Sequence, residues 1–168
     1  MAYAQHQNQG RSEVAHCAVL TLSDTRTIDT DKSGQLIQSM LREAGHEVAR
    51  YAIVKDDVAA LRLTFEPLLS DTAVDVILSS GGTGIARRDV TVDAIERLID
   101  RPLPGFGELF RMLSWHQIGS GAMMSRAVGG IARGKVVFAM PGSTPAVELA
   151  MTKLILPELG HLLGELRR

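Results

Sequence analysis

Cysteine, aromatic residues and net charge are all scarce in this sequence. Its 168 residues include one cysteine, 4% aromatic residues and a formal net charge of −1. The lone Cys17 excludes a disulfide within the chain and is consistent with a reducing compartment. We expect it to be a small buried strand residue. The near-zero charge gives no electrostatic footprint for nucleic acid. With few aromatics, the core must come from Leu, Val, Ile, Ala and Met.

Long apolar runs are also missing. No run approaches the roughly 18–20 residues that span a membrane. The first 13 residues are polar and lack the apolar segment of a signal peptide. We therefore predict a flexible tail over residues 1–13 and one domain over 14–168. The predicted protein is cytoplasmic and has neither a membrane nor a nucleic acid as partner.

Apolar strand patterns alternate with helix patterns along the chain, which is typical of an α/β fold with a parallel sheet. Strands are predicted at 16–22, 46–54, 75–79, 128–131 and 135–140, the last two joined by a turn at Arg133-Gly134. Helices are predicted from Asp31 or Ser33 to residue 45, over 58–69, 90–99 and 106–116, and from residue 143 or 144 onward. Residues 102–105 should break the chain, and Pro157 should kink the last helix.

Polar loops follow four of the predicted strands. They are Ser23-Asp24, Lys55-Asp56-Asp57, Gly81–Gly84 and Pro141-Gly142-Ser143. In a parallel sheet these loops share the carboxyl edge, where open α/β sheets bind their ligands. The sequence thus predicts a site with three carboxylates, two glycine turns and several hydroxyls.

The loop Ser80-Gly81-Gly82-Thr83-Gly84 is the strongest of these signals. Glycines let backbone N–H groups converge into a concavity that binds anions. The alternative is a sharp strand-to-helix turn that uses glycine for geometry alone. Arg87, Arg88 and Arg126 are candidate phosphate partners, and Ser125-Arg126 could reach the same edge or a neighbouring subunit.

Asp56 and Asp89 are the candidate catalytic acids, because both are predicted just past strands. Mg²⁺ is typically held by one or two carboxylates together with substrate phosphates. Such a pair would suit phosphoryl or nucleotidyl transfer. The alternatives are that Asp56 or Asp57 caps the second helix and Asp89 caps the third. Asp24 could be a turn residue or a ligand contact.

Three common site patterns are not met. Residues 129–135 approximate a P-loop, but Val136 stands where Ser or Thr would hold Mg²⁺. Arg87 replaces the third glycine of a dinucleotide fingerprint. The histidines are scattered without the spacing of a zinc site.

Six short motifs together resemble the MoaB/MogA family of molybdenum-cofactor biosynthesis proteins, and are closest to its MoaB branch. The likeness covers about residues 15–165. The motifs are Ser-Asp-Thr-Arg from Ser23, Asp-Lys-Ser-Gly from Asp31, Ser80–Gly84 with Arg88–Thr91, Pro-Gly-Phe-Gly-Glu from Pro104, Ser125-Arg126-Ala127 and Pro141-Gly142-Ser143. The resemblance implies a three-layer α/β/α molybdopterin-binding fold with a mostly parallel, Rossmann-like sheet. It also implies homotrimers or homohexamers.

The same resemblance implies a function in molybdenum cofactor biosynthesis. Active members transfer AMP from Mg-ATP to molybdopterin and release pyrophosphate. The family's two functional acids match Asp56 and Asp89, which the resemblance assigns to metal and pterin positioning. It assigns Gly81–Gly84 and Gly142-Ser143 to phosphate and pterin contacts. The alternative is a non-catalytic protein that binds molybdopterin or another protein of the pathway.

Overall fold

The computed structural model describes residues 13–87 and 89–168. The predicted tail therefore lies outside the described residues except for Glu13, and so does Arg88. The described residues form a six-stranded sheet in the order β2-β1-β3-β6-β5-β4. The strands are β1 (His16–Leu22), β2 (Glu47–Val54), β3 (Val76–Ser80), β4 (Arg101–Pro102), β5 (Val128–Ala132) and β6 (Lys135–Met140).

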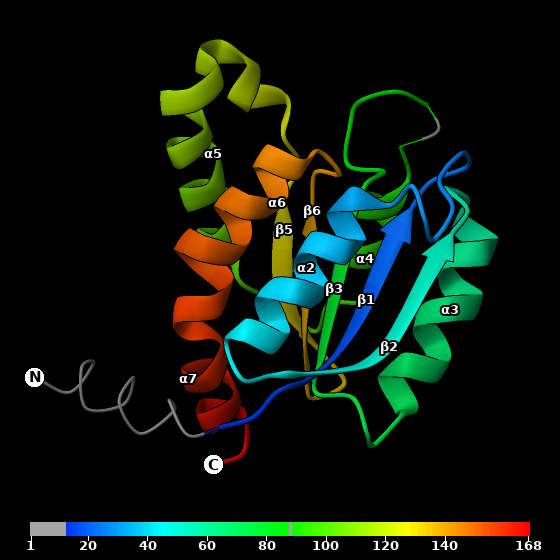
Figure 1. Ribbon diagram of the computed structural model, residues 1–168, viewed down its shortest axis with the longest axis vertical. Helices are drawn as coiled ribbons and strands as arrows, with labels where there is room; N and C mark the ends of the chain where they lie inside the picture. Colours follow the sequence, from blue (N-terminus) through cyan, green and yellow to red (C-terminus); the bar gives the residue numbers. More distant parts are fainter. Residues whose placement is uncertain (1–12, 88) are drawn as a thin grey trace, which may run out of the picture.

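The first four strands of that order run parallel, while β5 is antiparallel to both β6 and β4. Helices α2, α5, α6 and α7 cover one face of the sheet, and α3 and α4 cover the other (Figure 1). The predicted three-layer, mostly parallel fold is confirmed. The α-helices are α2 (Lys32–Glu43), α3 (Val58–Ser70), α4 (Thr91–Glu96), α5 (Pro104–Ile118), α6 (Thr144–Ala150) and α7 (Leu156–Leu166).

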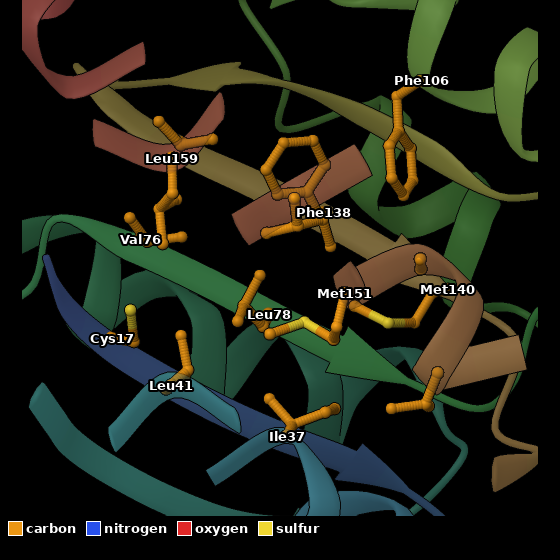
Figure 2. Close-up of a cluster of buried hydrophobic side chains, with 14 of the residues drawn as sticks. Cys17, Ile37, Leu41, Val76, Leu78, Phe106, Phe138, Met140, Met151 and Leu159 are labelled. Carbon is orange, nitrogen blue, oxygen red and sulfur yellow. The ribbon is translucent and has the colours of Figure 1, made fainter. Parts of the chain in front are cut away.

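Alternation along the central strands divides the core into two layers, because successive strand side chains point to opposite faces. On β3, Val76 and Leu78 pack with the α2 side, and Ile77 packs with the α3 side. Figure 2 shows the layer on the α2 side, to which Met140, the last residue of β6, and Met151 both contribute. Cys17 is fully buried there, as predicted, and burial raises the pKa of its thiol to about 12.

Two helices differ from the sequence prediction because of proline. The sequence predicts a break at residues 102–105 and a helix from residue 106, but α5 begins at Pro104. In the first turn of a helix the missing N–H of proline costs no hydrogen bond. The predicted kink at Pro157 takes the form of a π-helical segment, η2 (Met151–Ile155), between α6 and α7. There the Leu156 amide donates to the Met151 carbonyl, five residues back.

The strand and helix ends place the polar loops together. The Asp31 side chain caps α2 by accepting from the Gly34 amide, which selects Asp31 over Ser33 as the capping residue. The Asp57 side chain caps α3, which confirms the capping alternative for Asp57 and not for Asp56. Over residues 13–87 and 89–168, no helix has the length and apolar character needed to cross a bilayer.

Candidate functional site

Four loops meet at the carboxyl edge of the parallel strands, as predicted. The Gly81 amide donates to the Met140 carbonyl at 3.0 Å, which joins the loop after β3 to the end of β6. Gly142 packs so closely on this loop that a Cβ there would lie 3.0 Å from the Gly81 Cα. The Ser23 amide donates to the Val54 carbonyl at 2.9 Å and joins the loops after β1 and β2. We call this edge the rim.

The glycine turn after β3 brings backbone close to an acid. Gly81 and Gly82 have φ values of +100° and +62°, a region that favours glycine. A Cβ on Gly82 would stand 2.6 Å from Asp56 Oδ1 and would also collide with the Thr91 hydroxyl. Both glycines therefore serve the turn, and Gly82 also leaves room for the Asp56 carboxylate.

Asp24, Asp56 and Asp89 come together at the rim. The Asp56 amide donates to Asp24 Oδ1 at 3.3 Å, and Asp56 Oδ1 accepts from the Thr91 hydroxyl at 3.4 Å. Burial, followed by the negative charges of Asp89 and Asp24, raises the pKa of Asp56 above its usual value. A cation at this place would relieve the repulsion among the three carboxylates.

Asp89 belongs to the loop and not to the following helix. Its Oδ2 accepts from the Ala86 amide at 2.8 Å, whereas the N-cap residue of α4 is Val90, which makes no side-chain cap. The alternative that Asp89 caps the third helix is therefore wrong. A Cβ on Gly84 would lie 2.5 Å from Asp89 Oδ2, so this glycine makes space for the second acid.

The donor set fits a metal that shares its ligands with a substrate. Within residues 13–87 and 89–168, no group of three or more His, Cys, Asp or Glu side chains is arranged to hold a metal ion by itself. The two carboxylates Asp56 and Asp89 would supply part of a magnesium shell, and Mg²⁺ commonly completes such a shell with phosphate oxygens and water. A metal at Asp56 and Asp89 stays a prediction.

The predicted hydroxyl contacts differ in their exposure. Ser80 and Thr83 are buried, and the Ser80 hydroxyl lies 3.5 Å from that of Thr21. The Ser23 Oγ accepts from the amides of Thr25 and Arg26 and so shapes its own loop. Ser143, in contrast, is exposed at the start of α6 and makes no capping hydrogen bond. Of these four, Ser143 is the one best placed for a ligand.

The antiparallel strand β5 brings Ser125 and Arg126 to the same rim. Val128 at the start of β5 pairs with Ala139 near the end of β6, so the residues before β5 arrive beside the glycine turn. The Arg126 Nε donates to the Gly84 carbonyl at 3.0 Å. A cavity of about 420 Å³ opens next to it, lined in part by Pro104, Gly107 and Glu108 of the Pro-Gly-Phe-Gly-Glu motif.

The sequence does not reveal that a buried cluster around Asp31 supports the rim. The Asp31 carboxylate is fully buried and accepts from Arg26 at 3.2 Å and from the Tyr51 hydroxyl at 2.7 Å. Burial alone would raise the pKa of Asp31, but hydrogen bonds from Thr21, Gly34 and Tyr51 and the charge of Arg26 lower it. Arg26 also donates to the Gly142 carbonyl at 3.0 Å, which ties the loop after β1 to the loop after β6.

The fold and the rim define a three-layer α/β protein with a candidate ligand site at the carboxyl edge of its sheet. Residues 18–161 match the family model described as a probable molybdopterin binding domain. A molybdenum cofactor biosynthesis protein B from Bacillus cereus is 54% identical over 169 aligned residues, which cover 100% of this chain and 99% of that protein.

Solved structures agree with this match. A crystal structure of a molybdenum cofactor biosynthesis protein B superimposes with a TM-score of 0.90 at 55% identity, covering 93% of this chain and 98% of that one. The tungsten cofactor synthesizing protein MoaB from Pyrococcus furiosus superimposes with a TM-score of 0.82 at 38% identity, covering 93% and 99%. The chain therefore belongs to the molybdenum cofactor biosynthesis family that carries the molybdopterin-binding domain.

Proposed function

We propose that this protein binds molybdopterin and adenylylates it with Mg-ATP, giving molybdopterin-AMP and pyrophosphate. The observation that carries the proposal is the meeting of Asp24, Asp56 and Asp89 beside a positive-φ glycine turn at the rim. A scaffold has no use for acidic side chains that raise the pKa of one another next to a glycine turn. A site that binds a metal and phosphates does.

Each part of the rim has a role in this reaction. The terminal phosphate of molybdopterin attacks the α-phosphate of ATP, and pyrophosphate leaves. The backbone of Gly81–Gly84 would hold a phosphate group, and Gly142 and Ser143 would contact phosphate or pterin. Asp56 and Asp89 would hold Mg²⁺, which supplies charge neutralisation on the phosphates when bound. The raised pKa of Asp56 supports this assignment, because a bound cation would favour its ionised form.

Pyrophosphate release tests the proposal. Purified protein receives molybdopterin, ATP and Mg²⁺, and the double variant Asp56→Asn/Asp89→Asn is assayed beside it. We expect the wild-type protein to release pyrophosphate and the double variant to lose release by orders of magnitude. Asp57→Asn is the matched control: Asp57 caps α3 from the same loop, and Asn caps helices equally well, so this variant should keep its activity.

Molybdopterin binding separates this proposal from its alternative. Wild-type protein that binds molybdopterin without releasing pyrophosphate would refute the enzyme and leave a non-catalytic binding protein of the same pathway. Equal loss in the Asp57→Asn control would instead point to a general effect on the loop.

A further inference from the structure

Arg126 reaches across the rim to the loop that carries Asp89. Its Nε donates to the carbonyls of Gly84 at 3.0 Å and Thr83 at 3.4 Å. Its Nη2 donates to the Asp89 carbonyl at 2.6 Å. Its Nη1 forms an ion pair with Asp93 of α4 at 3.1 Å. One guanidinium thus joins the beginning of the loop, its end and the helix that follows.

The Asp89 loop comprises residues 83–89, and its described residues, 83–87 and 89, have little apolar packing to hold their shape. Ile85 is 72% exposed, and Ala86 and Arg87 are exposed as well. Hydrogen bonds inside the loop join Ala86 and Asp89 in both directions, from the Ala86 amide to the Asp89 carboxylate and from the Asp89 amide to the Ala86 carbonyl. These two hydrogen bonds hold the shape of the turn, but they do not hold its position relative to the sheet. Arg126 supplies that connection, because it comes from a distant segment before β5.

The geometry of the guanidinium suits this task. Arginine presents its five N–H donors in a rigid planar fork, whereas lysine is a compact point charge on a flexible stem. Here Nε, Nη1 and Nη2 all donate to protein oxygens on the loop and on α4. A phosphate bound by the same donors would have to displace these contacts.

We infer that Arg126 is a positioning residue, which holds the Asp89 loop so that the Asp89 carboxylate lies beside Asp56. The inference rests on the proposed adenylyl transfer and deepens it. In this inference Arg126 acts on the reaction through the loop backbone and not through contact with a phosphate. Misplacement of a reacting group by about 1 Å can lower turnover by about 100-fold, so the tether matters even though it touches no substrate.

A double-mutant cycle on pyrophosphate release measures this indirect action. Arg126→Gln should lower kcat by about 10- to 100-fold with the KM for ATP changed little. In the Asp89→Asn background the same change should cost only about 2-fold more, because the group that Arg126 positions is already disabled. Arg126→Lys should fail to restore kcat, since one ammonium cannot span both ends of the loop.

Other outcomes would overturn the inference. If Arg126→Gln lowers kcat by the same factor in both backgrounds, Arg126 acts independently of Asp89. If it raises the KM for ATP and leaves kcat unchanged, Arg126 contacts the nucleotide directly. Arg50→Gln is the matched control, because Arg50 is an exposed arginine of β2 paired with Asp71 at 3.0 Å, and it should leave both parameters unchanged.

Amide hydrogen exchange tests the tether without any activity. In wild-type protein the Ala86 amide is bonded to Asp89, and we expect Arg126→Gln to speed its exchange by about 10-fold or more while β3 amides stay unchanged. Unaltered exchange at Ala86 would refute the inference whether or not the protein is an enzyme. Faster exchange in a protein that releases no pyrophosphate would establish the tether and refute the adenylyl transfer instead.

Discussion

Asp56 is a residue whose charge the folded protein disfavours. Burial and the charges of Asp89 and Asp24 raise its pKa, although a hydrogen bond from Thr91 acts in the opposite direction. Structural carboxylates are usually placed where their ionised form is stabilised by a partner. An acid whose pKa is raised by two neighbouring acids is typical of a functional site. At such a residue the group that serves function can also lower the stability of the fold.

Replacement of Asp56 by Asn should therefore lower activity without lowering stability. The raised folded-state pKa means that the carboxyl group stabilises the fold fully while protonated and loses that contribution as pH rises through the folded-state pKa. Asn keeps a side-chain oxygen to accept from Thr91. We expect Asp56→Asn to match or exceed wild-type stability at pH 7.5 in urea denaturation, with a smaller difference at pH 3.5. A variant less stable than wild type at pH 7.5 would contradict the explanation that burial and the charges of Asp89 and Asp24 raise the pKa of Asp56.

Gly82 gives a second prediction at the scale of one residue. Its φ of +62° and the nearness of Asp56 Oδ1 make any Cβ costly. Gly82→Ala should lower the free energy of unfolding by more than about 1 kcal/mol and should also reduce pyrophosphate release. Gly164→Ala is the control, because a Cβ on Gly164 in α7 meets nothing within 4 Å. It should raise stability by about 0.5–1 kcal/mol in thermal or urea unfolding; equal losses in both variants would refute the argument.

At the scale of elements, Asp31 joins parts of the fold that the sequence alone does not connect. It caps α2, binds Tyr51 of β2, and pairs with Arg26, which in turn holds Gly142. The Ser33 hydroxyl donates to the same Gly142 carbonyl at 2.7 Å. The loop after β6 is thus fixed to the loop after β1 through a buried carboxylate, so α2 and β2 both support the rim.

Asp31→Ala should accordingly destabilise the protein by about 2 kcal/mol. The change removes the α2 cap and leaves the Tyr51 hydroxyl and the Arg26 guanidinium, whose side chain is 33% exposed, without their carboxylate partner. Asp31→Asn keeps the cap and should cost less. The lowered pKa of Asp31 means that its contribution is complete above the unfolded value of 3.8 and is lost as pH falls through the folded-state pKa. Urea titrations at neutral and acidic pH measure this. If Asp31→Ala lowers the free energy of unfolding by less than about 1 kcal/mol, the cluster around Asp31 does not stabilise the loops of the rim.

The sequence predicts the parallel strands and the rim because each depends on local patterns. Continuous apolar runs define β1, β3 and β6, and the loop residues follow directly from where these runs end. It does not reveal β4, which has two residues and no pattern of its own. The sequence places Tyr51 in a strand but gives no sign of its hydrogen bond to Asp31. The partners of Arg126 are equally unpredictable, because they depend on β5 running antiparallel to β6. Tertiary placement decides such contacts, and no periodicity encodes it.

At the scale of the whole molecule, several exposed apolar side chains gather along α5 and the segment that follows it. Met112, Trp115 and Ile118 recur every third residue along α5 and are 54%, 59% and 58% exposed. Met123 and Met124 of the following 3₁₀ segment η1 (Gly119–Met124) are exposed too. Exposed apolar side chains that gather in one region mark an interaction surface. We propose that this surface lies between copies of the chain in the homotrimer or homohexamer that the family resemblance predicts.

Trp115→Glu tests that assembly. A charge in the middle of an apolar contact loses its hydration on association, so the variant should show a lower molar mass by light scattering while its circular dichroism stays that of the wild type. Leu63→Glu is the matched control, since Leu63 is 77% exposed but lies on α3, across the sheet from α5. It should keep the wild-type mass. If Leu63→Glu lowers the mass and Trp115→Glu does not, the copies meet through the α3 side. The rim would then be open on the α5 side, and Ser125 and Arg126 would face solvent in the assembled protein.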